Sequence, residues 1–150
     1  MTPQITPCLC FNGDAEEAAK FYTSIFKDGA ITKTSYYTEA GKEHNSFAVG
    51  SVMMVAFTIN GTPFTALNGG PQFKHSEAVS FQISCKDQEE VDYYWDKLRG
   101  GGDEKKQQCG WVGDRFGVSW QVVPVQLAEY ISAGGEKGER YEGYDEHEEA

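Results

Sequence analysis

The chain has 150 residues, of which 39% are hydrophobic, 13% aromatic and 24% charged. This composition is typical of one globular domain with a packed core, and it excludes a disordered or fibrous chain. Thirteen Lys and Arg residues stand against 23 Asp and Glu, which gives a formal net charge of −10. Such a charge repels phosphate backbones and anionic membrane surfaces, so we expect neither nucleic acid nor a membrane as a partner.

The N-terminal sequence MTPQITPCLC lacks the basic start and apolar run of a signal peptide. The longest apolar runs, such as residues 52–57, are far shorter than the ~20 residues of a membrane-spanning helix. The sequence therefore predicts a cytoplasmic protein, in which cysteines stay reduced. The four cysteines show no paired C-x-x-C spacing, which favours structural thiols, with a redox pair or an adventitious metal site as alternatives: Cys8, Cys10, Cys85 and Cys109.

Two segments beginning at Asp14 and Asp87 match each other at an offset of 73 residues. Each Asp can cap a helix by accepting a hydrogen bond from the amide of the Glu three residues on. Apolar residues recur at i, i+3, i+4 and i+7 and predict one buried stripe per helix: Ala18, Phe21, Tyr22 and Ile25 in the first copy, and Val91, Tyr94, Trp95 and Leu98 in the second. Gly29 and Gly100 are expected to end the two helices.

Each predicted helix follows a strand-like run, at residues 5–11 and 78–85, and is followed by further strands. The expected later strands are 30–37, 45–59 with a break near Gly50, 62–67, 110–114 and 118–123. The pair Asn60-Gly61 predicts a type I′ hairpin turn. Residues 103–108 are too polar for a central strand and are expected to form a short edge strand or a loop.

The repeat predicts one domain over residues 1–132. Module one covers about residues 4–68, a linker covers 69–76, and module two covers about 77–124, followed by a short helix to residue 132. Residues 133–150 carry seven acidic side chains against two basic ones. They are expected to form a mobile acidic tail.

The opening ITPCLCFNG of residues 5–13, with the following AEEA and FY, resembles the start of PhnB-like proteins. The closing CGWVGDRFGVSWQVVP of residues 109–124 resembles their end. These proteins are a branch of the glyoxalase/bleomycin-resistance/dioxygenase, or vicinal-oxygen-chelate, superfamily. The resemblance covers about residues 4–124 and implies an α+β fold in which two paired βαβββ modules form a curved mixed sheet with a central cup. It also implies a homodimer with a small-molecule ligand.

Metal-dependent members of this superfamily hold a divalent cation with His or Glu side chains from four inner strands. In this sequence the corresponding positions fall near Pro7, Ala66, Ser80 and Gln121. A slip of one residue adds only the thiol of Cys8 as a good ligand. The three histidines lie in a turn, the linker and the tail: His44, His75 and His147. We therefore expect no metal or other cofactor, and a divalent-metal-dependent lyase, isomerase or dioxygenase with atypical ligands remains the alternative.

PhnB-like sequences are often described as ubiquinone methyltransferases. A methyl-donor nucleotide is usually held by a glycine-rich turn that follows a strand and precedes a helix. Here residues 100–102 are glycines that follow the second predicted helix. The sequence therefore argues against a methyltransferase, and whether the protein catalyses any reaction is left open.

Several side chains are candidates for contact with a ligand. The amide of Gln121 can orient a neutral polar group or satisfy nearby backbone. Trp111 can stack on a ligand or fill the core. Cys109 can act as a nucleophile, although no histidine is near it in sequence, and Arg115 can meet an anion or a surface acid. The candidate set is Gln121, Trp111, Ser119, Cys109, Arg115, Phe73, Ser80 and Cys8. The predicted function is small-molecule binding, with an antibiotic-sequestering resistance-type protein as a further alternative.

Overall fold

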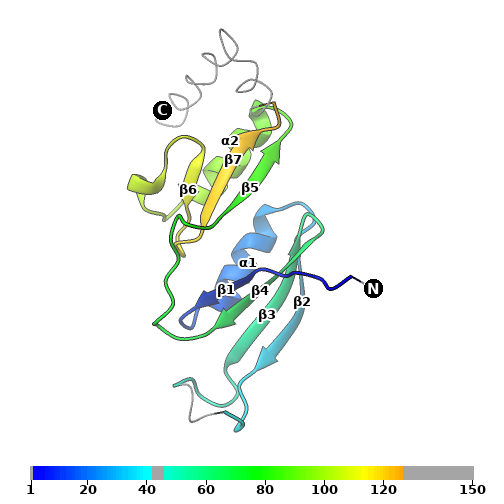
Figure 1. Ribbon diagram of the computed structural model, residues 1–150, viewed down its shortest axis with the longest axis vertical. Coiled ribbons are helices and arrows are strands. Elements are labelled where there is room, and N and C mark those ends of the chain that lie inside the picture. The colour runs from blue at the N-terminus through cyan, green and yellow to red at the C-terminus, as the bar shows by residue number, and fades with distance from the viewer. Residues whose placement is uncertain (1, 42–45, 127–150) are drawn as a thin grey trace. The chain divides into compact units, whose positions relative to one another are not determined.

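The computed structural model describes residues 2–41 and 46–126 of the chain. The chain divides into two compact units, Met1–Lys74 and His75–Ala150. Each unit combines one sheet with one α-helix (Figure 1). The predicted α+β class is confirmed. Over the described ranges, no helix is long and apolar enough to cross a membrane.

The first unit holds a four-stranded mixed sheet in the order β1-β4-β3-β2. Its strands are β1 Cys8–Phe11, β2 Ala30–Tyr36, β3 Val52–Ile59 and β4 Thr62–Asn68. β1 runs parallel to β4, and the other pairs are antiparallel. Helix α1, Ala15–Ile25, packs on one face, where the ring of Tyr22 stacks on Phe57 at a centroid distance of 6.0 Å.

The second unit holds a three-stranded sheet in the order β5-β7-β6. Its elements are β5 Ser80–Cys85, helix α2 Gln88–Arg99, the 3-10 helix η2 Glu104–Lys106, β6 Trp111–Gly113 and β7 Ser119–Pro124. β5 is parallel to β7, and β6 is antiparallel to it. The buried stripe of α2 packs against the buried residues of this sheet, which are Ile83, Cys85, Val112, Trp120 and Val122.

The predicted hairpin turn at Asn60-Gly61 is confirmed, because these residues have φ values of 50° and 79° and join the paired residues Ile59 and Thr62. The strand expected over residues 45–59 begins only at Val52. Gly50, at φ 90°, lies in the turn before it. Residues 103–108 form η2 and one isolated bridge from Gln108 to Trp111 rather than an edge strand.

The two helices begin and end differently. Asp87 accepts a hydrogen bond from the amide of Glu90 at 2.9 Å, as predicted, and Gly100 caps the C-terminus of α2. The predicted cap at Asp14 is wrong, because its side chain makes no capping hydrogen bond. The predicted end at Gly29 is also wrong, because α1 already ends at Ile25. Residues 125–126, where the helix to residue 132 was expected to begin, form a turn. Its residues 127–132 and the tail lie outside the described residues.

The start of α1 is held instead by Asn68, at the end of β4. Its Oδ1 accepts hydrogen bonds from the amides of Gly13 at 2.9 Å and Ala15 at 3.0 Å, and its Nδ2 donates to the carbonyl of Val52 at 3.0 Å. The hydroxyl of Tyr37 donates to the Asn68 carbonyl. With only 3% of its surface exposed, Asn68 joins four segments of the first unit from inside the core.

Candidate functional site

The face of the second sheet opposite α2 carries polar side chains. The strand register places Ser80 beside Ser119, Gln82 beside Gln121, and Trp111 beside Gln121. Because side chains alternate along a strand, these five residues lie on the face away from the buried Trp120 and Val122. We call these five residues the open face.

Three side chains of the open face form a hydrogen-bonded chain, which we call the polar ladder: Ser80, Gln82 and Gln121. Gln82 Nε2 donates to Gln121 Oε1 at 3.4 Å, and Gln121 Nε2 donates to Ser80 Oγ at 2.8 Å. The amide of Gln121 is therefore held from both sides by β5. Within the described residues, three polar groups of the ladder make no hydrogen bond and can bind another molecule. They are the second side-chain N–H of Gln121, the side-chain oxygen of Gln82 and the hydroxyl proton of Ser80.

A pocket of about 460 Å³ lies beside the polar ladder, between η2 and strands β6 and β7. Trp111 and Ser119 belong both to this pocket and to the open face. The lining residues are Glu77, Lys105, Lys106, Gln108, Cys109, Trp111, Val112, Gly113 and Ser119. The pocket thus joins one aromatic wall to an edge that carries charged and polar groups.

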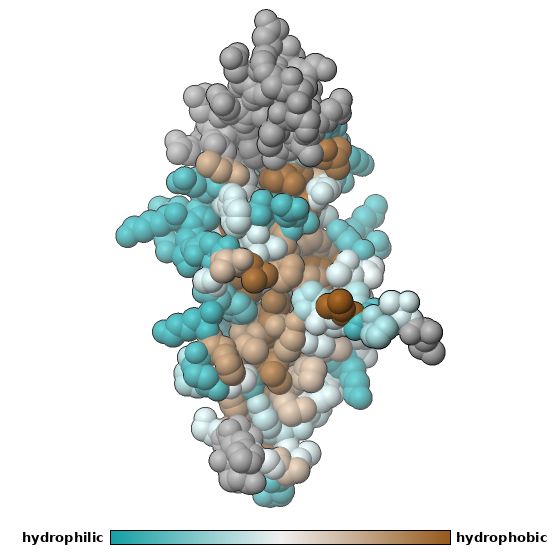
Figure 2. Space-filling view, viewed as in Figure 1, coloured by the Kyte–Doolittle hydropathy of each residue, from teal (hydrophilic) through white to brown (hydrophobic). Residues whose placement is uncertain are grey.

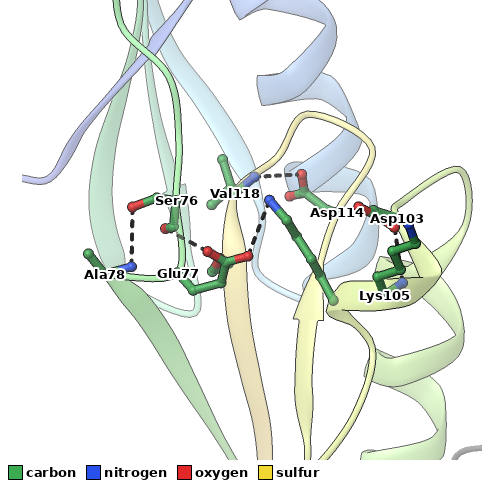
Figure 3. A network of polar contacts seen from close by, with 9 residues as sticks. Ser76, Glu77, Ala78, Asp103, Lys105, Asp114 and Val118 are labelled. Atoms are coloured by element: carbon green, nitrogen blue, oxygen red, sulfur yellow. Dashed lines mark hydrogen bonds and ion pairs between the residues drawn. The ribbon is translucent and has the colours of Figure 1, made fainter.

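A salt bridge closes one side of the pocket. The side chain of Lys106 passes over Gly113, and a Cβ atom at position 113 would lie 3.1 Å from Lys106 Cδ. The Nζ atom of Lys106 forms the salt bridge with Glu77 Oε1 at 3.2 Å. A backbone hydrogen bond at Glu77, together with the Lys106 ammonium group, holds the pKa of the Glu77 carboxyl below its usual range. Figure 3 shows Glu77 on the segment before β5 and Lys105 on the η2 turn. Among the described residues the Lys105 side chain makes no ion pair, and its backbone amide donates to Asp103 Oδ1 at 3.0 Å.

Asp114 fixes the turn that joins β6 to β7. Asp114 is 3% exposed, and its carboxylate accepts hydrogen bonds from the amides of Phe116 at 2.8 Å and Val118 at 3.1 Å, and from Trp120 Nε1 at 2.9 Å. Figure 3 shows the contact with Val118. This contact sets the position of β7 and hence of Gln121. Arg115 lies exposed in the same turn, with its Cβ 3.3 Å from the Cβ position of Gly101, and it does not line the pocket.

Cys109 lies in a two-residue hairpin turn at the mouth of the pocket. Gln108 and Trp111 exchange backbone hydrogen bonds of 3.0 and 2.8 Å across it. Cys109 has φ 59° and Gly110 has φ 78°, which are the values of a type I′ turn. A side chain rarely adopts this conformation, and here it places an exposed thiol beside Trp111.

The other two candidates lie in the first unit. Cys8 is exposed on β1, on the side opposite the buried Leu9. Phe73 follows β4 and is 55% exposed, with its ring 3.4 Å from the Cβ position of Gly69. The sheet of the second unit thus groups Gln121, Ser80, Ser119, Trp111 and Cys109, whereas Cys8 and Phe73 are described within the first unit alone.

The positions that correspond to metal ligands in the superfamily carry donors that fit a hard divalent cation poorly. Ser80 and Gln121 contribute a hydroxyl and an amide. Ala66 is wholly buried on the α1 side of its sheet, whereas its neighbour Thr65 pairs with Cys8 and lies on the other side. No group of three or more His, Cys, Asp or Glu side chains converges within residues 2–41 and 46–126. Mn²⁺ or Mg²⁺ would need carboxylates or imidazoles here.

The turns between strand and helix also fit a methyl-donor nucleotide poorly. Asn68 already occupies the amides at the start of α1, and Asp87 occupies the start of α2. Neither turn has the glycine-rich pattern of an anion-binding turn, since residues 12–14 include one glycine and residues 86–87 include none. The three glycines at residues 100–102 follow α2, as expected.

Comparison with protein families gives one match over most of the chain. The family model described as 3-demethylubiquinone-9 3-methyltransferase matches residues 3–123. No curated protein sequence matches the chain.

Solved structures with the same fold differ in their relation to the chain. A PhnB protein from Bacillus cereus, which bears the same methyltransferase description, is 33% identical over 81% of this chain and 99% of its own, with a TM-score of 0.69. A Pseudomonas aeruginosa protein is 20% identical over 82% of this chain and 98% of its own, with a TM-score of 0.66. The fosfomycin resistance protein FosX of Listeria monocytogenes, in complex with Mn(II) and sulfate, is 17% identical over 89% and 98%, with a TM-score of 0.56. The last two are similar in fold alone.

Proposed function

Because the chain belongs to the 3-demethylubiquinone-9 3-methyltransferase family, in the PhnB-like branch of the vicinal-oxygen-chelate superfamily, we propose that it binds a small organic molecule on the open face without a metal ion. The observation that carries the proposal is the polar ladder. The family resemblance implies a metal-ligand position near Gln121, and the Gln121 amide here donates a hydrogen bond to Ser80 at 2.8 Å. A fixed amide can donate and accept hydrogen bonds together but is a weak ligand for a cation.

The pocket chemistry supports a particular class of ligand. Trp111 offers a flat apolar surface, and the polar ladder offers unpaired donors and acceptors directly beside it. Lys105 adds one positive charge at the edge. This combination suits an uncharged or weakly anionic molecule with a planar part and a hydrogen-bonding carbonyl or hydroxyl group.

The proposal includes the assembly implied by the family. Two chains form a homodimer, and the protein acts in the cytoplasm. Arg115, in the turn that joins β6 to β7, is a further candidate for contact with the ligand.

Ligand screening by thermal shift, with and without EDTA, tests this function. We expect hits of the planar polar class that persist in EDTA, because no bound cation contributes to their affinity. In the Gln121→Leu variant these shifts should disappear, with an affinity loss of about tenfold or more from the unpaired ligand group. The matched control is Gln72→Leu in the first unit, since Gln72 is exposed and its side chain donates a hydrogen bond to the Gly69 carbonyl within its own loop.

Three results would contradict the proposal. Shifts that EDTA abolishes and Mn²⁺ restores would favour a metal-dependent lyase, isomerase or dioxygenase. Selective shifts with cationic drugs that survive Gln121→Leu would favour an antibiotic-sequestering protein. A shift with S-adenosylmethionine would support the methyltransferase description, and we expect none.

A further inference from the structure

Two cysteine side chains lie together on one face of strand β1. Cys8 and Cys10 are two residues apart in Cys8–Phe11, on the side opposite the buried Leu9 and Phe11. Burial, and to a lesser extent the nearby Cys8, raises the pKa of the Cys10 thiol. Because side chains two residues apart on a strand point to the same side, the two thiols lie on one face of β1.

The strand geometry works against a direct disulfide between them. Two residues along an extended strand separate the Cα atoms by roughly 6.6 to 6.8 Å. Disulfides usually span about 4.4 to 6.8 Å between Cα atoms, so this separation lies at their upper limit. A metal ion held between the sulfurs spans about twice a metal–sulfur bond of ~2.3 Å, which is much longer than an S–S bond. A bridging ion thus fits the extended strand better than a disulfide does.

The surroundings of the pair select a soft ion. The neighbouring strand places Thr65 beside Cys8 and Leu67 beside Cys10. The Cβ position of Gly69 lies 3.8 Å from Cys10 Sγ and 3.4 Å from the ring of Phe73, so the thiol has an aromatic ring nearby. No cluster of three or more His, Cys, Asp or Glu side chains forms in the described part of the chain. Hard cations and tetrahedral Zn²⁺ thus lack their further ligands, while two thiolates suffice for a soft ion.

We propose that Cys8 and Cys10 form a two-coordinate site for a soft monovalent cation of the Cu(I) and Ag(I) class. Each thiol releases one proton to solvent as its sulfur binds the metal, and no electron is transferred. The site lies in the first unit and uses different chemistry from the polar ladder, so it extends beyond the proposed function.

Competition for Cu(I) tests the site. The reduced protein is titrated without oxygen against a chromophoric Cu(I) chelator, in a Cys109→Ser background that removes the exposed thiol of the second unit. We expect one Cu(I) per chain and the release of two protons per metal at neutral pH. Cys8→Ser and Cys10→Ser should each weaken binding by about 100-fold, because a second thiolate on the same strand acts at high effective concentration.

Alkylation of the wild-type protein provides a second measurement that does not depend on folding of the variants. With one equivalent of Cu(I), iodoacetamide should leave Cys8 and Cys10 unmodified while Cys109 still reacts, as mass spectrometry of the peptides would record. The proposal is overturned if either serine variant binds Cu(I) as tightly as its parent. Release of one proton per metal, or equal protection of Cys109, would overturn it as well.

Discussion

At the scale of single residues, the core contains polar or ionisable groups whose roles are structural. Asn68 and Asp114 are both buried, and each satisfies several backbone amides of a turn. Cys85 is also wholly buried, on the side of its sheet opposite the open face, and burial strongly raises the pKa of its thiol. Because it faces α2, it takes no part in the candidate site.

The pH dependence of stability should report the burial of Cys85. Burial, and to a lesser extent the nearby charges of Glu90 and Asp87, raises the pKa of this thiol from 9.0 to about 12. Between these values the unfolded chain loses the thiol proton while the folded chain keeps it. Stability from this group is therefore complete below pH 9 and is lost as the pH rises toward 12, by up to ~1.4 kcal/mol per pH unit.

Urea unfolding of the wild type and of Cys85→Ala from pH 7 to 10.5 measures this contribution. The variant should be less stable at pH 7, because it loses packed volume. Its free energy of unfolding should fall less steeply above pH 9 than that of the wild type. Parallel curves for the two proteins would contradict the raised pKa.

At the scale of elements, regular patterns were predictable and long-range contacts were not. The helical stripes and the Asn60-Gly61 turn follow from local spacing, and they are confirmed except that Phe21 and Tyr94 are half-buried. The sequence did not predict the cap of α1, because the capping residue, Asn68, lies 55 residues beyond Gly13. The two Asp residues at equivalent positions of the repeat looked alike, yet only Asp87 caps its helix.

Within the candidate site, the alternation of β7 correctly placed Gln121 opposite Trp120 and Val122. The contribution of η2 was not predictable, because Lys106 reaches the pocket through a salt bridge to Glu77 across 29 positions of sequence. A buried carboxylate in the GDRFG segment was likewise missed. Asp114 carried a signal, however, since an Asp that opens a turn often accepts the amides that follow.

Substitutions at Asn68 and Asp14 should separate the true helix cap from the one that the repeat suggests. Asn68→Ala leaves the amides of Gly13 and Ala15 and the carbonyl of Val52 without their partner. We expect a loss of ~2 to 4 kcal/mol in the free energy of unfolding, since several buried groups become unsatisfied. Asp14→Ala should cost less than ~0.5 kcal/mol. Denaturant unfolding measures both, and equal effects would show that Asp14 caps α1 in solution.

At the scale of the whole molecule, the sequence repeat corresponds to two units that each carry a sheet, a helix and a core. The residues between them are largely exposed, and several are apolar, as with Phe73 and Val79. Apolar side chains also appear among hydrophilic ones on the face seen in Figure 2. The pairing of units into a cup depends on contacts that no local pattern encodes, so it remains a prediction from the family.

Limited proteolysis should identify the connection between the units. Lys74 is exposed and lies at the boundary between the two units, outside any helix or strand. Exposed segments without helix or strand are preferred cleavage sites, and the segment from Gly69 to Val79 contains only turns and irregular backbone. Among the described residues, the first cut should fall after Lys74 and give fragments 1–74 and 75–150, each with its own sheet. Mass spectrometry of early time points identifies the cut, and Lys74→Gln is the matched control that should delay it. Early cleavage at Lys33 within β2 would instead mean that the first sheet opens before the connection does.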